Sequence, residues 1–158
     1  MNKDLLIDLS ARLPYGVRGT VPVEVATGHY DMIDGSMLYD EKEILVELVG
    51  IGDGGYIDLM ILEKGWEDYD ISDYEFTLDD FTPLLRPMES MTEEEQHEYD
   101  NLHLDNLALP KVRLYYPMRW YTMDYLHVDW LNAHHFDYRG LIPKDLAAAV
   151  TVENNPYK

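Results

Sequence analysis

Two short apolar segments on either side of a glycine-rich turn constrain the fold of this 158-residue chain more than any other feature. Residues 43–51 and 56–62 are rich in β-branched and aliphatic side chains, and Gly52, Gly54 and Gly55 lie between them. Glycine adopts positive φ without steric cost, which is what a tight hairpin turn requires. The sequence therefore predicts a β-hairpin, and with it a sheet whose neighbouring strands run antiparallel.

Apolar spacing and capping residues predict three helices in the rest of the chain, at residues 3–13, 92–101 and 122–135. Ser90 and Thr92 each have a glutamate three residues downstream, which is the spacing of a capping box. In that motif two side chains satisfy the first free backbone amides of a helix. Thr122 is the expected N-cap of the last helix.

Alternating or β-branched apolar residues predict further strands at residues 17–26, 36–39, 74–78, 82–86 and 111–118. Pro22 places the first of these at a sheet edge or a bulge. Strands and helices do not alternate, and the links between strands are short. The predicted fold class is therefore α+β, with a small, mostly antiparallel sheet of four to six strands, open or barrel-like, and about three flanking helices. Residues 1–158 form one domain in this interpretation.

The chain is strongly acidic, with 31 acidic and 12 basic residues and a formal net charge of −19. Such a surface repels phosphate backbones and anionic lipids, so we expect neither direct nucleic-acid binding nor membrane binding. Three explanations of the charge stay open: solubility, a basic protein partner, or imitation of nucleic acid in order to occupy a basic groove. With no cysteine, no apolar run of membrane-spanning length and an acidic N-terminal segment unlike a signal peptide, the expected location is the cytoplasm.

One segment, residues 67–81, mixes acidic and aromatic side chains and is a candidate docking surface. Tyrosines would supply contact area and carboxylates would steer a basic partner. The alternative is an ordinary solvated acidic edge. The candidate partner-binding residues are Asp68, Tyr69, Asp70, Asp73, Tyr74, Glu75, Asp79 and Asp80.

A second segment, near the end of the last predicted helix, gathers diverse polar side chains and is a candidate site. Its residues are His127, His134, His135, Asp137, Tyr138 and Arg139. The alternative is a helix-capping network in which Asp137 pairs with Arg139 and Tyr138 packs. The position four residues after His127 is Leu131, so the two-histidine metal motif of a helix is absent. We expect no metal and no cofactor, and the phosphate-loop and serine-nucleophile motifs are missing.

Three stretches have a familiar pattern: ARLPYGV at residues 11–17, LLRPMESMTEEE at residues 84–95 and DWLNAHHFDYRGLI at residues 129–142. They resemble a family of small uncharacterised proteins common in gut Bacteroides species and their phages and prophages. Residues 18–81 and the tail after Leu146 carry no such resemblance. The resemblance implies a bacterial or phage cytosolic setting and accessory or host-interaction duties, and it implies no catalytic role.

The sequence thus leads to one principal hypothesis and two alternatives. The principal one is a phage or prophage accessory protein that binds a basic host or phage protein through an acidic, tyrosine-rich surface. Two special cases of this hypothesis are that the protein inhibits host defence and that it mimics nucleic acid. The first alternative is an enzyme or small-ligand-binding protein with a site around residues 134–139. The second is a structural or virion-associated protein.

Overall fold

The computed structural model describes residues 2–66, 71, 74–102 and 125–158. In these residues the helices are α1 (Lys3–Arg12), α2 (Glu93–Asn101) and α3 (Tyr125–Ala133). The strands are β1 (Arg18–Tyr30), β2 (Met37–Ile51), β3 (Ile57–Ile61), β4 (Thr82–Leu85) and β5 (Ala148–Ala149). The predicted strand at residues 111–118 and the predicted N-cap Thr122 lie outside the described residues.

The strands form one five-stranded sheet in the order β3-β2-β1-β4-β5. Every pairing is antiparallel except that of β4 with the two-residue β5. With three helices beside it in the described residues, the α+β class predicted from the sequence is confirmed. The sheet is open, because β3 and β5 lie at opposite ends of the order and do not pair. The barrel-like form is therefore not what the described strands adopt.

The predicted hairpin is present as β2 and β3, whose register runs from Val46 opposite Ile61 to Ile51 opposite Ile57. Gly54 has a φ of +75° in the connecting turn, as the glycine-rich sequence predicts. The predicted short strand at residues 36–39 is not separate, because it is the start of β2. It continues the pairing with β1 that begins at Arg18 opposite Glu47 and ends at Tyr30 opposite Met37.

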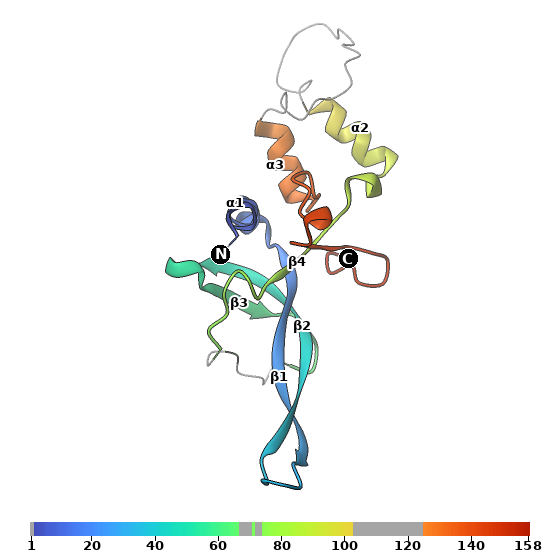
Figure 1. The fold of residues 1–158 in the computed structure, drawn as a ribbon. Coiled ribbons are helices and arrows are strands. Elements are labelled where there is room, and N and C mark those ends of the chain that lie inside the picture. Colours follow the sequence, from blue (N-terminus) through green and yellow to red (C-terminus); the bar gives the residue numbers. More distant parts are fainter. Residues whose placement is uncertain (1, 67–70, 72–73, 103–124) are drawn as a thin grey trace, which may run out of the picture.

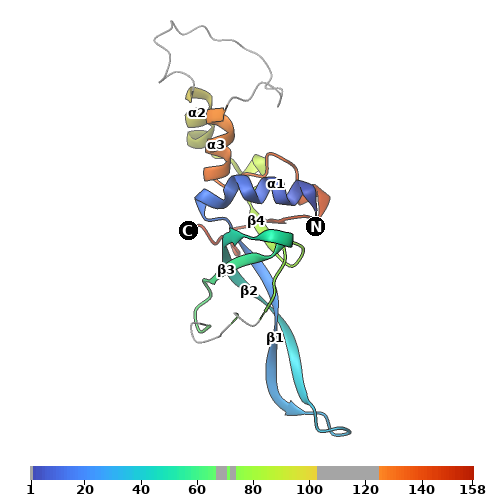
Figure 2. The ribbon, with the colours of Figure 1, turned by 90° about the vertical axis from the view of Figure 1, so that its left-hand side faces the viewer.

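The β1–β2 ribbon is the most prominent feature of the molecule (Figures 1 and 2). Its outer part extends past the other elements, and the loop that closes it forms the lower end of the molecule in both views. We define the arm as residues 24–43. Residues 25–30 and 37–43 lie beyond the pairings of β1 with β4 and of β2 with β3, so in the described part of the chain these two strands pair only with each other.

The main apolar core lies between α1 and the inner half of the sheet. Leu5 and Leu9 of α1 share one cluster with Val21, Ile44 and Phe81. Burial alternates along β1 up to Val23 and along β2 from Ile44, as a strand with one covered face requires. Beyond Val25, which still packs against this core, the arm has no buried side chain among the described residues.

A second, smaller cluster joins α2 and α3 at the opposite end from the arm (Figure 1). Tyr99 of α2 packs against Trp130 and Leu131 of α3, and Phe136 completes the cluster. Helix α2 begins with a full capping box, in which Thr92 accepts from the Glu95 amide and Glu95 accepts from the Thr92 amide. Of the two capping positions expected from the sequence, Thr92 is the one used.

Residues 74–78 do not form a strand. Their only ladder contact in the described chain is an isolated bridge between Thr77 and Tyr56. Asp80 accepts hydrogen bonds of 2.8 Å from both the amide and the hydroxyl of Thr77, which turns the chain instead of extending it. Among the helices of the described residues, none combines the length and the apolar character needed to cross a membrane.

Candidate functional site

The arm carries the largest group of exposed apolar side chains in the described structure. Met32 and Ile33 at its tip are 101% and 96% exposed. Tyr30, Leu38 and Tyr39 on its strands are also exposed. Large apolar side chains gathered on a protruding element are typical of a protein-binding surface. Sequence reasoning missed these residues, although an apolar pair directly before the Asp34-Gly35 turn is an unusual signal, because turns are normally polar.

The tip is held in a defined conformation by its own hydrogen bonds. The Asp31 carboxylate accepts from the Ile33 amide at 2.6 Å, and the Asp31 carbonyl accepts from the Gly35 amide at 3.0 Å. The Asp34 carboxylate accepts from the Ser36 amide at 2.9 Å, which lowers the pKa of Asp34. Gly35 has a φ of +72°. The loop therefore presents Met32 and Ile33 outward in an ordered turn, which reduces the entropy lost on binding.

The arm is acidic, with six carboxylate side chains and one lysine between residues 24 and 43. Glu24 of β1 lies directly opposite Glu41 of β2, and both are exposed. Like charges at directly opposed positions destabilise a strand pair by roughly 0.2–1 kcal/mol. A positively charged partner surface would remove this repulsion. The arm therefore combines acidic and tyrosine side chains, the character that the sequence analysis assigned to residues 67–81.

The candidate partner-binding residues of that segment are only partly described. Asp68, Tyr69, Asp70 and Asp73 lie outside the described residues. The Tyr74 hydroxyl donates to the Glu24 carbonyl at 3.2 Å, so Tyr74 lies beside the base of the arm. Glu75 is exposed. Asp79 accepts from the Asn2 amide at 3.4 Å, and Asp80 holds the Thr77 turn.

The three histidines of the second candidate site have different environments. His127 is buried on α3, with its ring edge-on to Tyr99 at 4.6 Å between centroids. His134 closes the end of α3, because its Nδ1 lies 2.8 Å from the Trp130 carbonyl oxygen and its ring stacks on the Trp130 indole. His135 has a left-handed φ of 59° and stacks on Tyr157 at 3.9 Å. Burial, together with the charges of Arg12 and Arg18, lowers the pKa of His135 to about 3.

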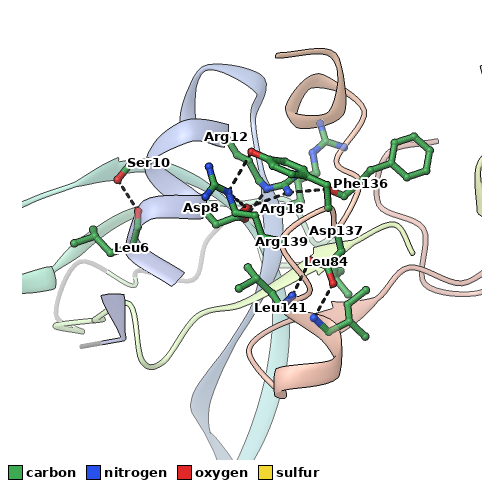
Figure 3. A network of polar contacts seen from close by, with 12 residues as sticks. Leu6, Asp8, Ser10, Arg12, Arg18, Leu84, Phe136, Asp137, Arg139 and Leu141 are labelled. Carbon is green, nitrogen blue, oxygen red and sulfur yellow. Dashed lines mark hydrogen bonds and ion pairs between the residues drawn. The ribbon is translucent and has the colours of Figure 1, made fainter. Parts of the chain in front are cut away.

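Asp137 and Arg139 have separate structural partners and do not pair with each other (Figure 3). The Asp137 carboxylate accepts from the amides of Leu141 and Ile142 at 2.7 and 2.9 Å, which closes the turn after α3. Arg139 lies 3.3 Å from the buried Asp8 carboxylate of α1 and also contacts the Tyr138 hydroxyl. A capping network is thus present, with Asp8 in the position that the sequence reading gave to Asp137.

The six polar residues of that segment therefore do not meet in one concavity. His134 and His135 line a polar cleft of about 650 Å³, which Tyr15, Arg18, Arg86 and Tyr157 also line. Arg139 lines a different, smaller hollow beside Asp4 and Lys144. The cleft is formed by the turn after α1, the start of β1, the inner part of β2, the residue after β4, the end of α3 and the C-terminal tail. Each of the three stretches at residues 11–17, 84–95 and 129–142 contributes to its wall.

Within residues 2–66, 71, 74–102 and 125–158, no group of three or more histidine, aspartate or glutamate side chains is arranged to hold a metal ion. Comparison with known proteins gave no match to any family model, any curated protein or any solved structure.

Proposed function

We propose that this protein acts by binding a partner protein with a basic surface, and that the arm makes the contact. The observation that carries the proposal is the pair Met32 and Ile33, fully exposed at the end of a protruding acidic ribbon. Burying a side chain of this size contributes roughly 1.5–3 kcal/mol. Two such anchors in an ordered turn have the character of an interface hot spot.

Charge and shape have separate roles in this proposal. The carboxylates of Glu24, Asp40 and Glu41 attract a basic partner and raise the rate of encounter. Tyr30 and Tyr39, 61% and 58% exposed, supply amphipathic contact area around the tip. The tip supplies the apolar anchors. Binding should therefore weaken as salt rises, while the apolar anchors keep part of the affinity at high salt.

The setting that we propose is that of a phage or prophage accessory protein in the bacterial cytoplasm, including an inhibitor of host defence. The net charge of −19 and the acidic arm favour a basic protein as partner over nucleic acid. Occupation of a nucleic-acid groove by the arm is one form that such binding can take. If the protein instead has a virion-associated role, it should be detected in purified phage particles.

The test is site-specific capture of the partner from a Bacteroides lysate. A photo-cross-linking residue at position 33 should give a covalent adduct with a basic protein, and the same residue at position 49 should not. Val49 is a matched control, because it is an exposed aliphatic side chain of β2 that lies outside the arm. The M32S/I33S variant should bind the partner at least about tenfold more weakly, which corresponds to about 1.4 kcal/mol of binding free energy.

The control variant V49S/M60S also replaces two exposed apolar side chains, which are 56% and 47% exposed and lie on β2 and β3. It should retain the partner. The proposal is contradicted if both double variants capture the same proteins equally well, or if the cross-linked protein is acidic.

A further inference from the structure

The polar cleft at the end of α3 is a second site, independent of the arm. Its volume of about 650 Å³ is within the ~300–1,000 Å³ usual for small-molecule sites. Its wall includes two arginines and two histidines against a single carboxylate, that of Glu47. In a chain with a net charge of −19, a wall that has two arginines and one carboxylate is much less acidic than the molecule as a whole, although Arg18 pairs with Glu47 and Arg86 pairs with Glu95. We infer that the cleft binds a small organic anion through a phosphate or carboxylate group.

Arg18 is the residue placed to hold the anion. Its Nε donates to Glu47 at 3.1 Å, one Nη donates to the Pro156 carbonyl, and its guanidinium lies over the Tyr157 ring. These contacts fix the guanidinium and use two of its five N–H donors. The Arg18 side chain is 33% exposed and lines the cleft, and in the described part of the chain its remaining donors have no hydrogen-bond partner. A fixed guanidinium with free donors suits bidentate binding of phosphate or carboxylate.

Arg86 supports the wall and does not hold the ligand. Both of its terminal nitrogens donate to the Glu95 carboxylate, at 2.6 and 2.8 Å. One of them also donates to the Ser90 carbonyl oxygen, and the guanidinium lies 4.1 Å from the Phe136 ring centroid. Its charge is therefore compensated locally. Its backbone fixes the wall as well, since it exchanges hydrogen bonds of 2.8 Å with His135 and Asp137.

His134 and His135 lie in the wall beside Arg18, and His134 has a ring nitrogen left for a ligand. The bond from His134 Nδ1 to the Trp130 carbonyl assigns the proton to Nδ1 and leaves Nε2 as an acceptor, which can accept from a hydroxyl group of the bound anion. The His135 side chain is buried, and its Nδ1 has no partner in the described structure. A buried polar atom without a partner is destabilising and is uncommon in folded proteins. The His135 backbone is hydrogen-bonded to Asn132 and Arg86, and its ring stacks on Tyr157 at 3.9 Å between centroids, which holds the ring in the wall.

To test this, the full-length protein is titrated with inorganic phosphate or with citrate, and binding is followed by nuclear magnetic resonance. Both the His134 and His135 ring signals and the Arg18 side-chain signal should shift and saturate. Binding by phosphate alone, by citrate alone or by both supports the site and distinguishes a phosphate ligand from a carboxylate ligand. Saturation by neither probe at millimolar concentration overturns the inference.

Variants separate this site from general attraction of anions. R18Q should weaken binding at least about tenfold, because it removes the charge-assisted bonds. K42Q makes the same change in net charge on the arm, where Lys42 is exposed, and should leave binding within about twofold. Equal binding by R18Q and K42Q overturns the inference. If R18Q does not fold, H134Q replaces it, and weaker binding by H134Q than by K42Q is the supporting result.

Discussion

Arg12 of α1 donates a 2.7 Å hydrogen bond to the backbone carbonyl oxygen of Phe136, which lies 124 residues further along the chain. The Arg12 side chain is completely buried, and so is that of Asp8, with which it pairs at 2.6 Å (Figure 3). Arg139 approaches the same carboxylate from the other side. This network joins the first helix to the turn after α3 and thereby fixes the part of the wall that carries His134 and His135.

The first prediction concerns this buried pair. R12M leaves the Asp8 carboxylate buried with Arg139 alone, and removal of one partner of a buried ion pair costs about 3–5 kcal/mol. Urea denaturation should show a loss of that order. The double variant D8L/R12M removes both charges and should lose less than R12M does. A larger loss in the double variant would show that the pair itself is the stabilising feature.

The second prediction concerns the contact between β1 and β4. A Cβ at Gly19 would lie 2.4 Å from the Thr82 carbonyl oxygen and 2.6 Å from the Phe81 ring, so G19A must displace β4. We expect a loss of about 1–3 kcal/mol from overpacking. Gly52 is the matched control, since the nearest atom to its added Cβ is 3.7 Å away. G52A should change the free energy of unfolding by less than about 0.5 kcal/mol.

The third prediction is a dependence of stability on pH near α2. The hydrogen bonds from Arg86 lower the pKa of Glu95 from 4.5 to about 2. The unfolded chain therefore takes up a proton at this site at a higher pH than the folded chain does. The contribution of the pair is complete above about pH 4.5 and is lost as the pH falls toward about 2.

Urea denaturation between pH 5 and pH 3 checks this dependence. The E95Q variant should show a smaller decline in stability over that range than the wild type. E93Q removes a charge from the same helical turn and keeps the pair between Arg86 and Glu95, so its decline should match that of the wild type. Identical slopes for all three proteins would contradict the assignment.

The fourth prediction concerns the repulsion on the arm. E41Q removes one of two like charges that lie directly opposite each other, so it should stabilise the arm by roughly 0.2–1 kcal/mol. Amide hydrogen exchange in residues 25–30 measures the opening of the arm directly, and it should slow down. The same substitution should reduce the rate of association with the partner. E75Q, which removes an exposed charge outside the arm, should leave exchange in the arm unchanged.

Much of the fold could be predicted from local pattern. The β2–β3 hairpin follows from its apolar runs and its glycines, and the start of α2 follows from Thr92 and Glu95. The length of β2 could not be predicted, because residues 37–43 are mostly exposed and polar. They are extended because they pair with β1, and in the sequence no alternation of apolar and polar residues indicates a strand there. The prediction of a strand at residues 74–78 was wrong because the Asp80 carboxylate accepts hydrogen bonds from Thr77 and so turns that segment.

The sites were less predictable than the fold. Sequence reasoning assigned docking to the longest acidic-aromatic run, whereas the exposed apolar anchors lie at Met32 and Ile33. The cleft could not be predicted at all, because Tyr15, Arg86 and His135 are far apart in the chain and meet only after folding. The segment around His134 was identified, but its polar residues face in several directions. Sequence proximity alone cannot show that.

The two strands of the arm leave a row of backbone amides and carbonyls along each outer edge, and in the described structure no other strand covers residues 25–30 or 37–43. An open edge of this kind is a template on which a second copy can add its own ribbon, and such addition is the first step of β-aggregation. The carboxylates of Asp40, Glu41 and Glu43 lie along one strand of the ribbon and repel an identical ribbon. The acidity that we propose attracts a basic partner should therefore also prevent self-assembly, and protonation or neutralisation of these groups should allow the arm to nucleate fibres.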